Sequence, residues 1–339
     1  MDSTISSTKV NFWNKVQLPE TNVDRQYGFL FKIYNPKTDG IIFIVTILLI
    51  PFISLFIFRF AFGMNPAVKD VNAWLPMANQ GVVILSALIG GYVLYNRNTK
   101  LFVKTGLLTF YTFLLIPFIV AMIGMMIISV IPTFVNVNEE GTSQLNNWGT
   151  LLVTWFQIIG ELVVIWIAFK STTDLKSRVL ETFKKNWRLL SITVAIGILI
   201  MVGICIFGYA AFASQIGLEE SENQNTITGP LKDANSTFKG IYIFTLIIFT
   251  VLAAPIAEEL ACRHAIFVGV GNRGIAIFIS AFYFGIMHVS NGDIENLLNY
   301  LIAGFILAIT FSISRGNVTY TWLVHMGYNF TALMLIVAK

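Results

Sequence analysis

APIAEELACRHAIF, residues 254–267, places Glu258, Glu259 and Arg263 inside an apolar run that extends from 241 to 270. A run of this length can cross a bilayer as a helix. An ionised side chain at the centre of such a helix costs about 3 kcal/mol or more unless a partner compensates it. These charges therefore indicate a membrane-spanning segment that also carries a functional site.

The composition of the whole chain agrees with a membrane protein. Of its 339 residues, 56% are hydrophobic and 12% are charged, whereas a soluble domain has about 25% charged residues. Continuous apolar runs favour helices over the alternating strands of a membrane β-barrel. We therefore expect an all-α, polytopic helical bundle in the lipid bilayer. The net charge is +4, and the basic residues lie in short loops between apolar runs. Orientation in the bilayer explains them, so we expect no nucleic-acid partner.

Nine apolar runs predict membrane-spanning helices, and eight is the alternative count because the second run is short and contains Gly90 and Gly91. The runs are 41–61, 81–95, 106–131, 149–169, 189–213, 241–270, 274–290, 295–313 and 318–338. Most of the 22 Lys and Arg residues fall on the side of the N-terminus. This asymmetry predicts a multi-pass protein of the cell membrane with a cytoplasmic N-terminus.

The polar loops and the cysteines give weaker signals. Residues 171–188 fit either an interfacial helix or an ordinary basic loop. Cys205 and Cys262 lie within apolar runs and are expected to be packing residues.

The intramembrane polar residues divide the chain into three parts. Residues 1–40 form a polar, cytoplasmic tail, and 41–238 form a membrane region of unassigned role, in which Glu161 is an isolated carboxylate. All three histidines, His264, His288 and His325, fall in 239–338. We expect this last part to be the catalytic core.

Helix geometry places several of these polar residues at one depth. Glu258 precedes the turn at 271–273, and His288 follows this turn. At the rise of an α-helix, both residues lie about 20 Å from the turn. His325 and Asn329 follow the turn near Arg315 by about 14–20 Å. The four side chains can therefore meet in one layer of the membrane.

The direction of each side chain separates the two adjacent glutamates. Successive helical residues point about 100° apart, so Glu258 and Glu259 cannot both face one cavity. Glu259 and Arg263 are four residues apart, a spacing that suits an ion pair. Glu258 is then the carboxylate left for chemistry.

Three ordered motifs carry a resemblance to a known family. They are Glu258-Glu259-x-x-x-Arg263-x-x-x-Phe267, Phe284-x-x-x-His288 and His325-x-x-x-Asn329. Together they resemble the CPBP family of type II CAAX prenyl endopeptidases and Abi-type relatives, which include bacteriocin-immunity proteins. The resemblance covers about 90 residues.

The resemblance implies an intramembrane endopeptidase acting near the cytoplasmic side of the membrane. Glu258 and His288 would activate a water molecule, and His325 and Asn329 would stabilise the oxyanion. Two polar donors four residues apart on a helix suit that second task.

The resemblance leaves minor roles for the other motif residues. Glu259 and Arg263 would support the catalytic groups. Phe267 and Phe284 are weak candidates for substrate contact, since both are expected mainly to pack. His264 lies outside the motifs and is expected to be structural.

The expected partners are a peptide or protein substrate, with or without a lipid anchor, and the bilayer. We expect no cofactor, because the chain has no HExxH motif. The alternative is zinc held by Glu258, His288 and His325.

Two other functions are alternatives from the sequence. One is a catalytically inactive scaffold, regulator or immunity protein of the same fold. The other is a proton-coupled transporter, which the clustering of polar residues in one half disfavours.

Overall fold

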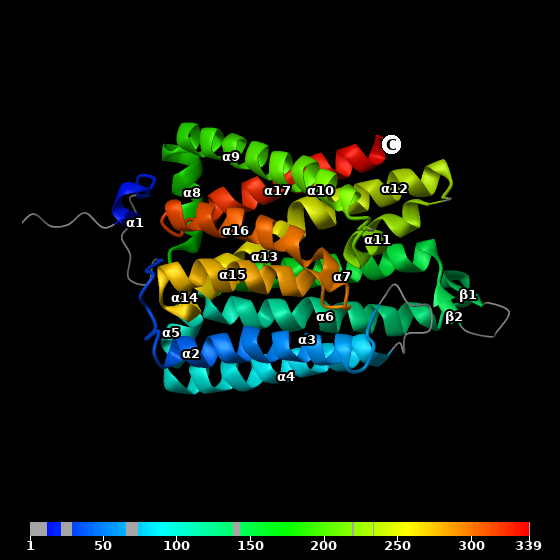
Figure 1. The fold of residues 1–339 in the computed structure, drawn as a ribbon, viewed down its shortest axis with the longest axis horizontal. Helices are drawn as coiled ribbons and strands as arrows, with labels where there is room; N and C mark the ends of the chain where they lie inside the picture. Colours follow the sequence, from blue (N-terminus) through cyan, green and yellow to red (C-terminus); the bar gives the residue numbers. More distant parts are fainter. Residues whose placement is uncertain are drawn as a thin grey trace, which may run out of the picture.

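The computed structural model describes residues 12–21, 29–65, 74–137, 143–218, 220–232 and 234–338. Its helices lie side by side along the long axis of an elongated bundle, with a two-stranded hairpin at one end (Figure 1). The all-α polytopic fold is thus confirmed. Much of the predicted tail, at 1–11 and 22–28, lies outside the described residues.

Within this part of the chain, seven helical stretches are long and apolar enough to cross a membrane. They are Asp39–Phe60, Trp74–Arg97 (α4), Leu107–Ser129 (α6), Asn147–Ser171 (α7), Trp187–Gln215, Ser236–Val270 and Ile294–Ile313. The two other predicted runs are also helical. α15 (Arg273–His288) is shorter, and α17 (Val318–Val337), which carries His325 and Asn329, is not one of the seven.

Three of the long stretches change from α- to π-helical turns along their length. The first comprises α2 (Asp39–Ile44), η1 (Val45–Leu49) and α3 (Ile50–Phe60). The second comprises α9 (Trp187–Met201), η3 (Val202–Gly208) and α10 (Tyr209–Gln215). The third comprises α12 (Ser236–Leu246), η5 (Ile247–Ala253), α13 (Ala254–Glu258), η6 (Glu259–Ala265) and α14 (Ile266–Val270).

Two of these wide turns have a cause in the sequence. Pro51 and Pro255 follow η1 and η5 respectively. A proline has no N–H to donate, and its ring clashes with the carbonyl four residues earlier, so the preceding turn opens. π-Helical turns also occur frequently at functional sites, and η6 begins directly after Glu258.

Shorter elements connect the long helices. They are α1 (Phe12–Lys15), α5 (Thr99–Lys104), η2 (Pro132–Phe134), β1 (Val135–Val137), β2 (Ser143–Leu145), α8 (Leu175–Lys185), α11 (Glu222–Thr228) and η4 (Gly229–Leu231). The long stretch Ile294–Ile313 comprises η7 (Ile294–Asn296) and α16 (Leu297–Ile313). The strands pair antiparallel, with Asn136 opposite Gln144. α8 shows that residues 171–188 contain a helix, one of the two alternatives left open by the sequence: Leu175 and Val179 are buried, and Arg178 donates a hydrogen bond to the Gly316 carbonyl at 2.7 Å.

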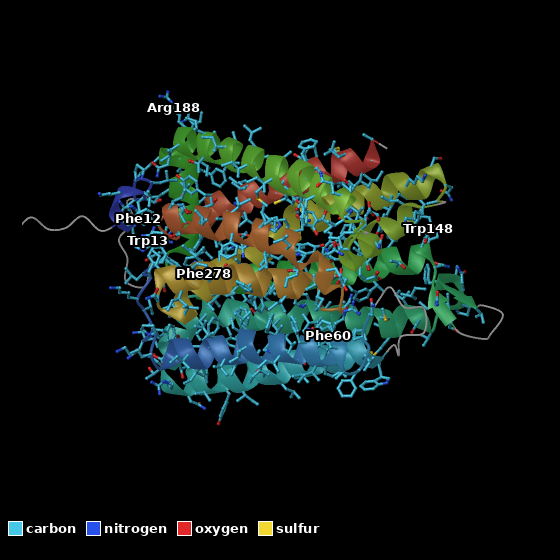
Figure 2. All side chains as sticks on the ribbon, in the orientation of Figure 1. Phe12, Trp13, Phe60, Trp148, Arg188 and Phe278 are labelled. Carbon is cyan, nitrogen blue, oxygen red and sulfur yellow. The ribbon has the colours of Figure 1, made fainter. Side chains whose placement is uncertain are left out.

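The two ends of the bundle differ in charge. α8 lies across one end, called here the basic end, whereas the strands and α11 lie at the other, the hairpin end (Figure 1). Arg188 marks the basic end in Figure 2, and Trp148 lies toward the hairpin end.

Basic residues concentrate on helix ends and turns of the basic end: Lys32, Lys37, Arg97, Lys100, Lys104, Lys170, Lys176, Lys184, Lys185, Arg188, Arg273 and Arg315. The described part of the hairpin end has fewer: Arg59, Lys232 and Lys239. By the positive-inside rule this distribution would place the basic end in the cytoplasm, and the orientation stays a prediction from the charges.

A cluster of rings, called here the aromatic plug, fills the core toward the basic end. It comprises Phe29, His264, Phe267 and Phe311, all buried. The Phe267 and Phe311 ring centroids are 4.8 Å apart, and those of Phe29 and Phe311 are 4.9 Å apart. The sides of the bundle, by contrast, expose apolar side chains such as Phe278 (Figure 2), as expected for contact with lipid. The protein is therefore a multi-pass membrane protein.

Candidate active site

A cavity of about 670 Å³ lies among the helices. Glu258, His288, His325 and Asn329 all line it, although they come from α13, α15 and α17. The structure thus brings together the four residues that the sequence places at one depth.

Glu259 faces the protein interior instead of this cavity. Its side chain is fully buried, and its Oε2 lies 3.2 Å from Nε of Arg263, which is equally buried. Arg263 also donates to the Ser280 hydroxyl at 3.1 Å. The expected ion pair is present, and Glu258, with 15% of its side chain exposed, is the carboxylate that reaches the cavity.

His325 connects the two glutamates. Its Nδ1 lies 3.1 Å from Glu259 Oε1, and its Nε2 lies 3.8 Å from Glu258 Oε2. A carboxylate can only accept a hydrogen bond, so Nδ1 carries the proton and donates a hydrogen bond to Glu259. The imidazole is therefore oriented by a buried carboxylate, with Nε2 turned toward Glu258.

His288 is oriented by its own helix. Nδ1 donates to the Phe284 carbonyl at 2.8 Å, and the ring stacks on Tyr300 with centroids 4.6 Å apart. Nε2 is then the nitrogen left to accept a proton or bind water. Phe284 lines the cavity as expected, and the Arg263 guanidinium lies 4.6 Å from its ring centroid.

Asn329 uses one donor to hold the wall of the cavity. Its Nδ2 donates to the Thr250 carbonyl in η5 at 2.7 Å. A primary amide has two N–H groups, so a second donor remains for a substrate oxygen.

Phe267 packs in the core, as mainly expected, and the structure gives no support to its weak candidacy for substrate contact. Its ring is fully buried in the aromatic plug and is not part of the cavity lining. The helix turns Phe267 away from Glu258 and against Phe311. His264 is structural, as predicted, because Nε2 donates to the Thr105 carbonyl at 2.9 Å within this plug.

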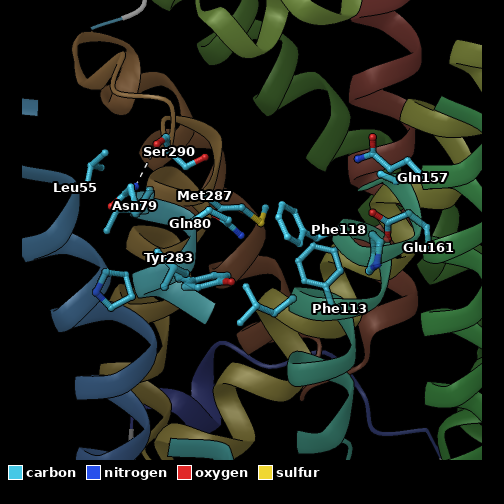
Figure 3. A pocket seen from close by; sticks show the side chains of 16 residues that line it. Leu55, Asn79, Gln80, Phe113, Phe118, Gln157, Glu161, Tyr283, Met287 and Ser290 are labelled. Atoms are coloured by element: carbon cyan, nitrogen blue, oxygen red, sulfur yellow. Dashed lines mark hydrogen bonds between the residues drawn. The ribbon is translucent and has the colours of Figure 1, made fainter. Parts of the chain in front are cut away.

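Glu161 in α7 is a site residue to which the sequence assigned no role. It lines the main cavity and also a second cavity of about 330 Å³. Figure 3 shows Glu161 on one side of this second cavity and Asn79 on the other. Among the described residues, no hydrogen-bond partner reaches its Oε2. The sequence feature that could have identified Glu161 as a site residue is its carboxylate inside an otherwise apolar run.

α11 covers part of the cavity and is tied to α16, so we call it the lid helix. The hydroxyls of Ser221 and Tyr300 are 2.6 Å apart, and the Glu222 N–H donates to Asp293 Oδ2 at 3.0 Å. Burial raises the pKa of Asp293, and this hydrogen bond opposes the rise. No motif identifies these contacts, because they join polar loops far apart in the sequence.

The cavity reaches the hairpin end, where Ser214, Glu220 and Thr226 contribute to its lining. The expectation of cleavage near the cytoplasmic side is therefore not supported, because the basic residues lie at the opposite end.

The alternative zinc site does not fit the geometry. Among the residues that the structure describes, no group of three or more His, Cys, Asp or Glu could hold a metal ion. Glu258, His288 and His325 line one cavity without forming such a group.

Comparisons with known proteins support the assignment from the motifs. A family described as type II CAAX prenyl endopeptidase Rce1-like matches residues 240–331, which contain all three motifs. An uncharacterized protein from Mycoplasma capricolum subsp. capricolum is 36% identical over 328 residues, which cover 95% of this chain and 94% of that protein. No solved structure matches the chain. Residues 240–331, which contain the three motifs, form an Rce1-like domain of the CPBP family.

Proposed function

We propose that the protein is an intramembrane endopeptidase of the cell membrane that hydrolyses a peptide bond with an activated water molecule. The observation that carries this proposal is that Glu258, His288, His325 and Asn329 line one cavity. A second feature supports it: Glu259 holds His325 as a carboxylate orients the histidine of other hydrolytic sites.

In the proposed reaction, Glu258 and Nε2 of His288 hold the water molecule. Glu258 accepts its proton while the oxygen attacks the substrate carbonyl carbon. The resulting oxyanion is stabilised by His325, protonated at Nε2, and by the free N–H of Asn329. Glu258 then passes the proton to the leaving nitrogen as the C–N bond breaks, which returns the site to its starting state.

The variant Glu258→Gln tests this proposal. It keeps the shape of the side chain but removes the proton acceptor, so cleavage should fall by at least about 100-fold with unchanged abundance in the membrane. Glu20→Gln, on the exposed N-terminal segment, is the matched control. Comparing the peptides of cells that carry each variant would also reveal the substrate. Unchanged peptides and phenotype in Glu258→Gln would favour an inactive scaffold.

We also propose that the reaction needs no bound metal, since no described cluster suits one. Cleavage by the purified protein should persist in a chelator. Stoichiometric zinc in the purified protein, with loss of cleavage on its removal, would contradict this part of the proposal.

A further inference from the structure

The catalytic cavity is accessible from the hairpin end. Ser214, Glu220 and Thr226 are exposed and line its outer part. Among the described residues, none of the lining positions comes from the turns of the basic end. A substrate that follows the cavity therefore approaches Glu258 from the hairpin side.

The aromatic plug closes the opposite route. Phe267 follows Glu259 by two helical turns toward the basic end, and it is fully buried against Phe311. His264 adds a hydrogen bond to Thr105, which ties the plug to the turn after α5. This packing separates the catalytic residues from the basic end.

The charge difference between the two ends indicates on which side of the membrane the cavity opens. Lys and Arg accumulate in short loops on the cytoplasmic side of membrane proteins, and here they concentrate at the basic end. The hairpin end, where the cavity opens, then faces away from the cytoplasm.

Carboxyl groups also outnumber cationic groups in the lining of the cavity, even with the protonated His325 that the proposed reaction uses. Glu161, Glu220 and Glu258 contribute carboxyl groups, and no described Lys or Arg lines it. A cleft lined mainly by one sign of charge attracts ligands of the other sign, most strongly at low ionic strength.

We infer that the site receives neutral or cationic peptide segments from the extracytoplasmic side, such as exported peptides or the outer segments of membrane proteins. Cleavage of these segments rests on the proposed peptidase function, whereas the direction of access rests on the structure and the charge distribution alone.

Cysteine labelling tests the direction without any need for activity. Ser214→Cys marks the mouth, and Ser177→Cys on exposed α8 marks the basic end. The native Cys205 and Cys262 are buried, but Cys205 also lines the cavity, so both variants are made in a Cys205→Ser background. A membrane-impermeant maleimide on intact cells should label Ser214→Cys directly and Ser177→Cys only after permeabilisation. The reverse pattern would overturn the inference.

Membrane vesicles test the substrate class. Right-side-out vesicles should cleave a library of impermeant, lysine-containing peptides, and inverted vesicles should cleave it only after detergent is added. Replacing lysine by glutamate in a cleaved peptide should lower kcat/KM several-fold at low salt, with a smaller difference at high salt. Glu258→Gln vesicles give the background.

The outcomes separate the two proposals. Cleavage by inverted vesicles alone, or a preference for acidic peptides, would contradict the inference while leaving the peptidase function intact. Absence of cleavage even in detergent would contradict the peptidase function, and the labelling result would still decide the direction of access.

Discussion

Glu259 links the catalytic histidine to a buried cation. One carboxylate oxygen pairs with Arg263, and the other accepts a hydrogen bond from His325. Loss of one member of a buried ion pair leaves an uncompensated charge, which costs about 3–5 kcal/mol. Glu259 should therefore matter for folding and for catalysis in different ways.

A double variant can separate these two contributions. Glu259→Leu alone should greatly reduce abundance in the membrane, because the Arg263 charge stays buried without its carboxylate partner. Glu259→Leu with Arg263→Met removes both charges and should recover most of the abundance, since apolar replacement of a buried pair is often neutral. Cleavage should stay low because His325 has lost its orienting acceptor. Abundance is measured by immunoblot and cleavage with purified protein.

Recovery of full activity in the double variant would show that Glu259 serves Arg263 only. Glu181→Leu, which removes a partly exposed carboxylate of α8, controls for the loss of a glutamate in general.

The sequence predicts the catalytic residues better than their surroundings. Glu258, His288, His325 and Asn329 could be found because motif spacing and helical rise fix their depth. The contact between His325 and Glu259 could not, because it depends on how α17 crosses η6. Glu161 stands alone in its apolar run, so no spacing rule connects it with residues nearly 100 positions away.

Close helix packing positions α15, which carries His288. Gly304 of α16 faces the backbone of α15, and a Cβ there would lie 2.9 Å from the Ala281 Cα. Backbone cannot move aside as a flexible side chain can. The contact thus requires glycine for steric reasons.

We predict that Gly304→Ala lowers stability by about 1–3 kcal/mol through overpacking and reduces cleavage by displacing α15. Gly203→Ala is the matched control, because a Cβ at Gly203 would meet nothing within 4 Å. The control should be neutral or slightly stabilising. Apparent Tm in detergent measures both variants. Equal Tm values would mean that α15 and α16 separate at little cost.

Asp293 is one of two side-chain acceptors at the N-terminus of the lid helix, with Ser221. Asp293→Ala leaves the Glu222 N–H without its carboxylate partner, a loss of about 1.5 kcal/mol or roughly a tenfold shift in a local opening equilibrium. Amide hydrogen exchange in Glu222–Thr228 should accelerate accordingly. Asp293→Asn keeps an acceptor oxygen and should change exchange much less. Equal exchange in wild type and Asp293→Ala would show that Tyr300 and Ser221 hold the lid alone.

At the scale of the whole molecule, the apolar runs predict the helical bundle because nearly every long helix must be apolar to contact lipid. They do not predict the π-helical turns, which preserve apolarity while changing the direction of side chains. They also leave the cavity mouth undetermined, since it is built by α10 and the lid helix from polar and small residues without a motif. The direction of access can be inferred only from the position of the cavity mouth combined with the distribution of Lys and Arg between the two ends of the bundle.

Residues 239–338, which the sequence predicts to be the catalytic core, pack against earlier helices. α6 contacts η6, and α7 contacts η5 and α13. Glu161 of α7 also lines the catalytic cavity, and Thr105 accepts the His264 hydrogen bond.

A fragment that begins after residue 218 should therefore accumulate poorly, because its buried polar groups lose their partners. Co-expression with a 1–218 fragment should restore both abundance and cleavage, since the break falls between α10 and the lid helix and interrupts neither. Abundance and peptide cleavage of the fragment, alone and co-expressed, measure this dependence. Cleavage by the isolated fragment at the wild-type rate would show instead that the five described spans before residue 218 only anchor the enzyme.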